Sequence, residues 1–374
     1  MVTIPRRAVW PVIVVSTFVL GVPAPVGASP PDHPGDAPSA VRHVTVATYN
    51  VDFGTDLAPL FTITDPAKLV IAANTAYQAM IASNYAERAD AIAALLAKER
   101  PDVIGLQEIA TWETVDLAHR ELGFVMAYDF QSLLLADLAA RGVPYDVAVS
   151  NPTFQGSLPI SPTTVVRFTD KNLILARAGM ADAKLSTSDP AEGQYAARLP
   201  LPNLGIAVTR GWARVDVTVR GRTFRFFTTH LEAYSAAVRN LQAAELAGMV
   251  LASPYPVVVT GDINSRPTCT GVNTAAYDTL IATGLVEVWP VVHENDPCGG
   301  FTSGQESLTW PVSTLDHRID DIFFDPSAMD AVQADVIGDQ EADRTPSGLW
   351  PSDHAGSVAT LRLGKAEDGE REAT

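Results

Sequence analysis

The clearest chemical feature of the sequence is a carboxylate and an amide that directly follow one short apolar segment. Residues 256–259 (PVVV) form a β-branched run that is typical of a buried strand, and Asp262 and Asn264 follow it two residues apart. Asp and Asn at such a place often serve only the turn. The pair indicates a catalytic or binding site only if other segments place further polar residues in the same region.

Other strand-like segments repeat this pattern. Six further polar residues stand at the ends of such segments: Asn50, Glu108, His230, Asp320, Asp353 and His354. Each one alone could cap a turn or sit in the core. Because they are all carboxylates, amides and histidines at strand ends, we expect them to gather at one edge of a layered α/β structure, where such proteins place their sites.

The types of these residues point to one reaction. Oxygen ligands without cysteine favour a hard cation such as Mg²⁺, Mn²⁺ or Ca²⁺. Two histidines can stabilise or protonate a phosphate oxygen, and an aspartate next to a water held by an asparagine can act as a general base. The set therefore predicts metal-assisted hydrolysis of a phosphoester.

The elements that must position these residues can be read from periodicity. Helical spacing predicts helices over 83–100, 130–141 and 236–251. Strands are predicted at 43–49, 102–106, 165–168, 173–176, 206–219, 223–229, 256–259, 320–324 and 357–363, with a hairpin turn at 220–222. Hairpins mixed with helices favour an α+β layered protein over a parallel doubly wound sheet.

The two ends of the chain differ from its centre. Arg6 and Arg7 precede the apolar stretch 8–22 and then small residues, which predicts a signal peptide over 1–28 and a secreted protein. A membrane anchor is the alternative, but the stretch is short and two prolines interrupt its end, so we expect no stable span after signal removal. We further expect a disordered linker over 29–42, one domain over 43–363 and a disordered tail over 364–374.

Net charge and cysteine content indicate which substrates and which cysteine pairing to expect. The formal net charge of −17 repels polyanions, which favours a small-molecule or lipid head-group phosphoester over nucleic acid. In an exported chain, Cys269 and Cys298 are expected to form a disulfide, with two free thiols as the alternative. Two cysteines far from a second Cys/His pair are too few for a structural zinc site.

Six motifs together carry a family resemblance. In this order, YNVDFG, GLQE, TTHLEA, GDINSRP, RIDDIFF and SDHAGSVATL resemble the signature blocks of the endonuclease/exonuclease/phosphatase superfamily, which includes pancreatic-type deoxyribonucleases, bacterial sphingomyelinases and inositol polyphosphate phosphatases. The resemblance spans about residues 44–363. It implies a four-layer α/β/β/α sandwich of two mixed β-sheets flanked by helices.

The resemblance also implies a metal site. Glu108 resembles the principal metal-binding glutamate, and Asp353 a second acid on the metal side. Asn50 lies where the family places an amide near the metal or the phosphate, and Asp52 would support it. Mg²⁺ is the expected cofactor, with Mn²⁺ or Ca²⁺ as alternatives.

The remaining roles concern water and phosphate. By resemblance, Asp262 aligns or deprotonates the attacking water, Asn264 holds that water or the phosphate, and His230 contacts the phosphate. His354 acts as a base or as a cation against the transition state, and Asp320 orients its ring. The expected protein is a secreted, monomeric, metal-dependent phosphoesterase. A secreted nuclease and an inactive binding protein of the same fold remain alternatives.

The sequence departs from the family pattern in two ways. Asp321 stands where many members carry an aromatic residue, so a second acid could disturb the pair formed by Asp320 and His354. The segments 56–84 and 151–202 are longer than in the smallest nucleases of the family. We expect these two segments to shape the choice of substrate.

Overall fold

A computed structural model describes residues 42–181 and 184–364 of the chain. The predicted signal peptide lies outside these residues, as do the linker up to residue 41 and the tail from residue 365. Within the described ranges, no helix combines the length and apolar character that crossing a membrane requires.

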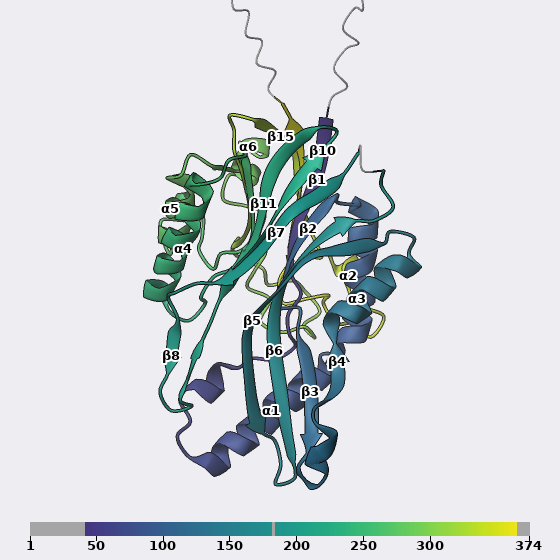
Figure 1. The fold of residues 1–374 in the computed structure, drawn as a ribbon, viewed down its shortest axis with the longest axis vertical. Coiled ribbons are helices and arrows are strands. Elements are labelled where there is room, and N and C mark those ends of the chain that lie inside the picture. The colour runs from purple at the N-terminus through teal and green to yellow at the C-terminus, as the bar shows by residue number, and fades with distance from the viewer. Residues whose placement is uncertain (1–41, 182–183, 365–374) are drawn as a thin grey trace, which may run out of the picture. The chain divides into compact units, whose positions relative to one another are not determined.

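Two mixed β-sheets form the centre of the domain (Figure 1). The first has the strand order β15-β16-β1-β2-β6-β3-β4, with β5 paired to β6, and the second has the order β13-β14-β12-β11-β10-β7. In each sheet one central pair is parallel, β1 with β2 and β11 with β12, and the other pairs are antiparallel. The crossover between the strands of each parallel pair is helical, with two α-helices between β1 and β2 and one between β11 and β12.

The strands of the first sheet are β1 (Arg42–Asn50), β2 (Val103–Gln107), β3 (Thr111–Asp116), β4 (Val125–Asp129), β5 (Tyr145–Pro159), β6 (Thr164–Arg177), β15 (Met329–Ile337) and β16 (Gly356–Leu363). Those of the second are β7 (Ser186–Gln194), β10 (Gly211–Val219), β11 (Arg222–His230), β12 (Val257–Asp262), β13 (Val286–Glu287) and β14 (Asp320–Phe324). A separate two-stranded ribbon consists of β8 (Leu199–Leu201) and β9 (Ile206–Val208).

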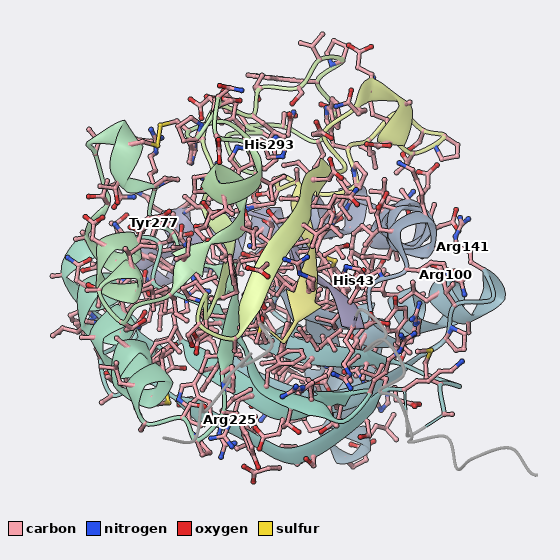
Figure 2. The ribbon with its side chains drawn as sticks, turned by 90° about the horizontal axis from the view of Figure 1, so that it is seen from above. His43, Arg100, Arg141, Arg225, Tyr277 and His293 are labelled. Carbon is pink, nitrogen blue, oxygen red and sulfur yellow. A yellow bond between two sulfur atoms is a disulfide. The ribbon has the colours of Figure 1, made fainter. Side chains whose placement is uncertain are left out.

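Helices cover the outer face of each sheet. The first sheet carries α1 (Pro66–Ala82), α2 (Tyr85–Glu99) and α3 (Phe130–Ala140), and the second carries α4 (Ala236–Leu251) and α5 (Ala275–Ile281). For example, Tyr277 of α5, labelled in Figure 2, packs its ring against Phe323 of β14 at 5.3 Å between centroids. The short helices are η1 (Ala58–Phe61), η2 (Leu117–Leu122), η3 (Thr268–Thr270), α6 (Val288–Val292) and η4 (Glu341–Asp343). The four layers confirm the predicted α/β/β/α sandwich.

The two sheets face each other across an apolar core. Alternation along each strand decides which residues enter it: Val44 and Val46 of β1 pack between the sheets, whereas Ala47 and Tyr49 pack under the helices. Gly105 of β2 allows a close approach, because a Cβ there would lie 2.4 Å from Oγ1 of Thr228 in the opposite sheet.

The helices predicted at 83–100, 130–141 and 236–251 are confirmed within two residues at each end. The two short strands predicted at 165–168 and 173–176 are instead one strand, β6. Its central residues Asp170 and Asn172 break the apolar pattern but are buried and hydrogen-bonded, to Thr153 Oγ1 and to the carbonyl of Gly211 respectively. Paired polar side chains of this kind can be accommodated inside a strand.

One further prediction needs correction. The strand predicted over 206–219 is divided into β9 and β10, with a break at residues 209–210. In segment 151–202, where only the two strands of the β6 region were predicted, the structure also has most of β5 together with β7 and β8. The glycines and prolines of this segment concealed strands, because pairing with neighbouring strands outweighed the weak local preference.

Candidate active site

The predicted site residues meet at one edge of the sandwich, at the end of the inter-sheet core. In the second sheet, His230, Asp262 and Asp320 lie side by side on three adjacent strands, since His230 is in register with Asp262 and Asp262 with Asp320. In the first sheet, Asn50 ends β1, Glu108 follows β2, and the Asp353–His354 pair precedes β16.

The same alternation that builds the core aims these residues inward. On β12, Val258 packs between the sheets and Asp262 lies four residues further on the same face; on β11, Phe226 and His230 stand in the same relation. Between the apolar and charged layers lies a polar one, in which Gln107 Nε2 donates to Thr228 Oγ1 of the opposite sheet at 2.8 Å. The site is therefore the polar continuation of the inter-sheet core.

Asn50 connects the two halves of the site. Its Nδ2 atom donates to Glu108 Oε1 and to Asp262 Oδ2, each at 3.1 Å, and its Oδ1 atom accepts the N–H of Asp52 at 3.0 Å. The amide thus holds the two carboxylates at a defined separation.

Three site residues adopt the left-handed backbone region without being glycine. Asp52 has a φ of 57°, Glu108 of 60° and Asn264 of 51°. Such conformations cost free energy and concentrate at functional sites, where the surrounding contacts impose them. Here the turn at Glu108 lets its Oε2 accept the backbone N–H of Phe53 at 2.9 Å.

Asn264 is fixed beside Asp262. Its backbone N–H donates to Asp262 Oδ1 at 2.9 Å, and its Nδ2 donates to the carbonyl of Leu231 at 3.0 Å. The second N–H and the oxygen of the amide remain for other partners. Burial first, and then the charge of Asp320, raise the pKa of Asp262 to about 6, which makes it a stronger base than an exposed carboxylate.

His354 is held by a carboxylate. Its Nδ1 donates to Asp320 Oδ2 at 2.8 Å. Burial alone would lower the pKa of His354, but the charges of Asp320, Asp353 and Asp262 and the hydrogen bond to Asp320 outweigh burial and hold the pKa well above its usual range. His354 is therefore an imidazolium at neutral pH.

His230 is held by a cation. Nη1 of the buried Arg210 donates to His230 Nδ1 at 3.1 Å. A guanidinium has no acceptor, so Nδ1 must be unprotonated and the proton of the neutral ring sits on Nε2. Burial first, and then the charges of Arg210 and His354, lower the pKa of His230 well below its usual range. Its Nε2 lies 3.4 Å from Asp262 Oδ2.

The first-sheet side of the site has an excess of carboxylates. Burial first, and then Asp353, Asp170 and Asp52, raise the pKa of Glu108 well above its usual range. Burial and then Asp52 raise the pKa of Asp353 to about 7. Arg88 lies 3.6 Å from Asp52 but spends most of its donors on backbone carbonyls. Crowded, buried carboxylates with too little positive charge fit a divalent cation.

A different trio can be drawn on distance alone. Asp262, Asp320 and His354 place ligand atoms within 4.8 Å of one another. However, Nδ1 of His354 is already engaged by its hydrogen bond to Asp320, whereas Glu108 and Asp353 carry raised pKa values among neighbouring carboxylates. The Glu108 side is therefore the better candidate for a cation. Within the trio, Asp320 and His354 are hydrogen-bonded and Nε2 of His354 lies 3.9 Å from Asp262 Oδ2.

Asp321 does not disturb the pair formed by Asp320 and His354 through direct contact. Successive residues of β14 face opposite sides, and Asp321 points to the outer face, where it accepts from Nε of Arg318 at 3.1 Å. Glu287 accepts from Nη2 of the same guanidinium at 2.8 Å. Asp321, the acid that departs from the family pattern, is therefore paired with the buried Arg318.

An open cleft of about 580 Å³ reaches the first-sheet side of the site. Asp52, Glu108 and Asp353 line it, together with the exposed Tyr234 and the loop 305–309. The predicted disulfide is present and joins Cys269 of η3 to Cys298. The sequence carried no signal for Arg88 as a support of the site, because its role depends on carbonyls from three separate segments. Arg210 had only its charge to mark it, with no pattern to pair it with His230.

Comparisons with known proteins agree with this geometry. The model of the endonuclease/exonuclease/phosphatase family matches residues 47–354. A search of curated proteins found no match.

Several solved structures share the fold. A family protein from Bacteroides thetaiotaomicron has a TM-score of 0.55 at 17% identity, over 87% of this chain and 99% of that one. The mannosyl-6-phosphatase Bt3783 of the same organism has a TM-score of 0.52 at 18% identity, over 86% and 100%. A protein from Beutenbergia cavernae has a TM-score of 0.51 at 23% identity, over 86% and 72%. At these identities the similarity concerns the fold.

Proposed function

Because this chain belongs to the endonuclease/exonuclease/phosphatase family, we propose that it is a metal-dependent phosphoesterase that hydrolyses its substrate by in-line attack of water. The observation that carries the proposal is the placement of Asp262 between the neutral His230 and the charged His354. A general base flanked by a hydrogen-bond donor and a cation suits attack of water on a phosphate.

The carboxylates of Glu108, Asp353 and Asp52 would hold the cation, with Mg²⁺ as the expected ion and Mn²⁺ or Ca²⁺ as alternatives. When bound, the cation supplies positive charge that neutralises phosphate oxygens. Asn50 supports the site by fixing Glu108 through its hydrogen bond at 3.1 Å.

Asp262 accepts a proton from the attacking water, whose oxygen forms the new bond to phosphorus. Asn264 orients that water or the phosphate with the amide atoms that Leu231 leaves free. His230, as a neutral ring, donates a hydrogen bond from its Nε2–H to a phosphate oxygen and keeps its proton. His354, protonated and held by Asp320, stabilises the negative charge that accumulates as the bond to the departing oxygen breaks.

We propose a small-molecule or lipid phosphoester as the substrate class. The net charge of −17 opposes binding of a long polyanion. The mannosyl-6-phosphatase of the same fold shows that the architecture hosts hydrolysis of a small phosphoester. We also propose that the protein is secreted and monomeric, and the Cys269–Cys298 disulfide supports an oxidising compartment.

The test is hydrolysis of p-nitrophenyl phosphodiesters and of p-nitrophenyl phosphate, with Mg²⁺ and with chelator. We expect turnover of at least one compound that chelator abolishes, and loss of that turnover in Glu108→Ala. Glu192→Ala, which removes an exposed carboxylate from β7, is the control and should retain full activity. Turnover by Glu108→Ala at saturating Mg²⁺ would refute the metal assignment. Plasmid DNA as the best substrate would favour a nuclease, and inactivity on every phosphoester would favour a binding protein.

A further inference from the structure

A second hollow adjoins the catalytic cleft and differs from it in character. It has a volume of about 270 Å³ and is lined mainly by apolar side chains. Its walls include Leu57, Phe61, Trp112, Phe168, Leu201 and Leu204. An apolar cavity of about 150 Å³ can already bind benzene, so this one is large enough for an apolar ligand.

The side chain of Phe53 lies between the cavity and the catalytic centre. The backbone N–H of Phe53 donates to Glu108, while the Phe53 ring contacts Phe168 on the cavity wall at 5.1 Å between centroids. A second aromatic contact joins the two hollows, because Phe61 of the cavity meets Tyr234 of the catalytic cleft at 5.0 Å. Aromatic side chains therefore form the partition between the two spaces.

A shallow groove continues around this partition. It shares Leu60 and Ala76 with the cavity, and Thr55, Asp56 and Ala79 with the catalytic cleft. The surface from the metal side of the site to the cavity is thus continuous. A ligand with a phosphate at one end and an apolar group at the other could contact both.

The two longer segments of the sequence supply most of the cavity wall, and Trp112, Leu204 and Ile206 complete it. Segment 56–84 supplies η1 and α1, and segment 151–202 supplies β5 and the start of the β8–β9 ribbon, which lie near one another in Figure 1. Nδ2 of Asn203, between β8 and β9, donates to the carbonyls of Leu60 and Ile63 and ties the two walls together. The exposed Ile206 stands at the cavity's rim.

We propose that this cavity binds an unbranched aliphatic chain of the substrate, so that the enzyme selects phosphoesters carrying one alkyl or acyl chain. The proposal rests on the phosphoesterase function proposed above and specifies its substrate class. Continuity with the catalytic cleft favours the substrate itself as the occupant, and the volume suits one chain. Each methylene that moves from water into the cavity should strengthen binding about fourfold until the cavity is full.

Binding can be tested without turnover. Methyl-, butyl- and octylphosphonate, as non-hydrolysable monomers, are titrated against the full chain while tryptophan fluorescence is recorded, since Trp112 lines the cavity. We expect the Kd to fall steeply from methyl to octyl. In parallel, kcat/KM for methyl, butyl and octyl p-nitrophenyl phosphate should rise with chain length, mainly through KM.

Two variants address the cavity in different ways. Ala76→Phe reduces the volume of the cavity. Ile206→Asp places a charge at its rim, and because Ile206 is exposed, the charged side chain can remain in contact with water. Both should flatten the dependence on chain length while keeping turnover of the methyl ester. Val332→Asp makes the same kind of change at an exposed residue of β15 and should leave that dependence intact. If Ala76→Phe does not fold, Ile206→Asp carries the test.

The outcomes separate the two proposals. Turnover of the methyl ester without any gain from longer chains, in Kd or kcat/KM, would refute the alkyl site and retain the phosphoesterase. Chain-dependent phosphonate binding without turnover of any ester would refute the phosphoesterase and retain the alkyl site. A gain that persists in both variants would place the chain elsewhere and overturn the assignment. Octyl binding measured as monomer and in phosphatidylcholine vesicles distinguishes a soluble amphiphile from a bilayer lipid, and either source supports the site.

Discussion

His230 and His354 flank the same carboxylate, yet their surroundings are opposite. The Nε2 atom of His230 lies 3.4 Å from Asp262 Oδ2 and that of His354 lies 3.9 Å from it. On the far side of each ring, however, Nδ1 of His230 accepts from Arg210 and Nδ1 of His354 donates to Asp320. Two rings of the same type, both within 4 Å of the base, are thereby given different charges.

The difference shows that the group bonded to Nδ1 of a buried histidine sets the charge of the ring. It thereby sets whether Nε2 donates as part of a neutral ring or of a cation. Burial lowers the pKa of both rings. Arg210 adds to that effect at His230, whereas three carboxylates reverse it at His354. One ring becomes a neutral donor and the other a cation, so the site can stabilise phosphate charge without placing two cations around Asp262.

The largest effect should follow from removing the charged ring. We expect His354→Ala to lower kcat by about 10²- to 10³-fold, because a positioned group that stabilises transition-state charge is lost. His230→Ala removes a neutral donor and should cost less. Single-turnover kinetics of both variants with an alkyl p-nitrophenyl phosphodiester measure the difference, and an equal loss in the two would contradict the assigned charges.

A smaller effect should follow from Asp320→Asn, which keeps the shape but removes the charge that holds His354 protonated. Burial would then dominate and the pKa of His354 would fall. We expect a loss of about 10- to 100-fold at pH 8, the range seen when the partner of a functional histidine is removed. Because a lowered pKa leaves the ring charged only in acid, the ratio of variant to wild-type kcat should rise towards pH 5.5, while protonation of Asp262, whose pKa is about 6, lowers the activity of both proteins. A uniform loss across this range would argue against the charge of His354.

Arg210→Met tests the opposite partner. The change frees Nδ1 of His230, removes a positive charge and lets the pKa of the ring rise. We expect about a tenfold loss of kcat, in keeping with the loss of one charge-assisted hydrogen bond. Arg210→Lys retains a charged donor and should recover part of the rate. Since Arg210 also lies 3.6 Å from Asp170, thermal unfolding of both variants serves to separate catalysis from stability.

The wild-type protein can show the difference without any substitution. In chelator, ¹⁵N–¹H NMR of labelled histidine should give a neutral His230 with its proton on Nε2 at pH 7, and a doubly protonated His354. As the pH rises, His230 should stay neutral and His354 should lose its proton at a higher pH than an exposed histidine, because the pKa of His230 lies well below the usual range and that of His354 well above it. Substitution of each histidine by Gln assigns the signals. Similar titration of both rings would refute the comparison.

Several features of the fold were predictable because they depend on local pattern. The helix over 236–251 and the strand that ends in Asp262 follow from spacing and β-branched composition. Strand β6 was predicted as two separate strands because the polar Asp170 and Asn172 interrupt its apolar pattern. Their hydrogen-bond partners, Thr153 and Gly211, lie on other strands and cannot be inferred from the local sequence. The strands of segment 151–202 were concealed for a similar reason, as their stability comes from pairing.

The sequence by itself determined which residues reach the site. Period-two alternation places Asp262 on the same face as Val258 and His230 on the same face as Phe226, so that the polar strand ends continue the inward-facing core residues. Only the tertiary structure decided what each residue does there. The approach of Arg210 to His230 and of Asp320 to His354 joins residues 20 and 34 positions apart. Charge state and tautomer depend on such contacts and on burial, which no local pattern encodes.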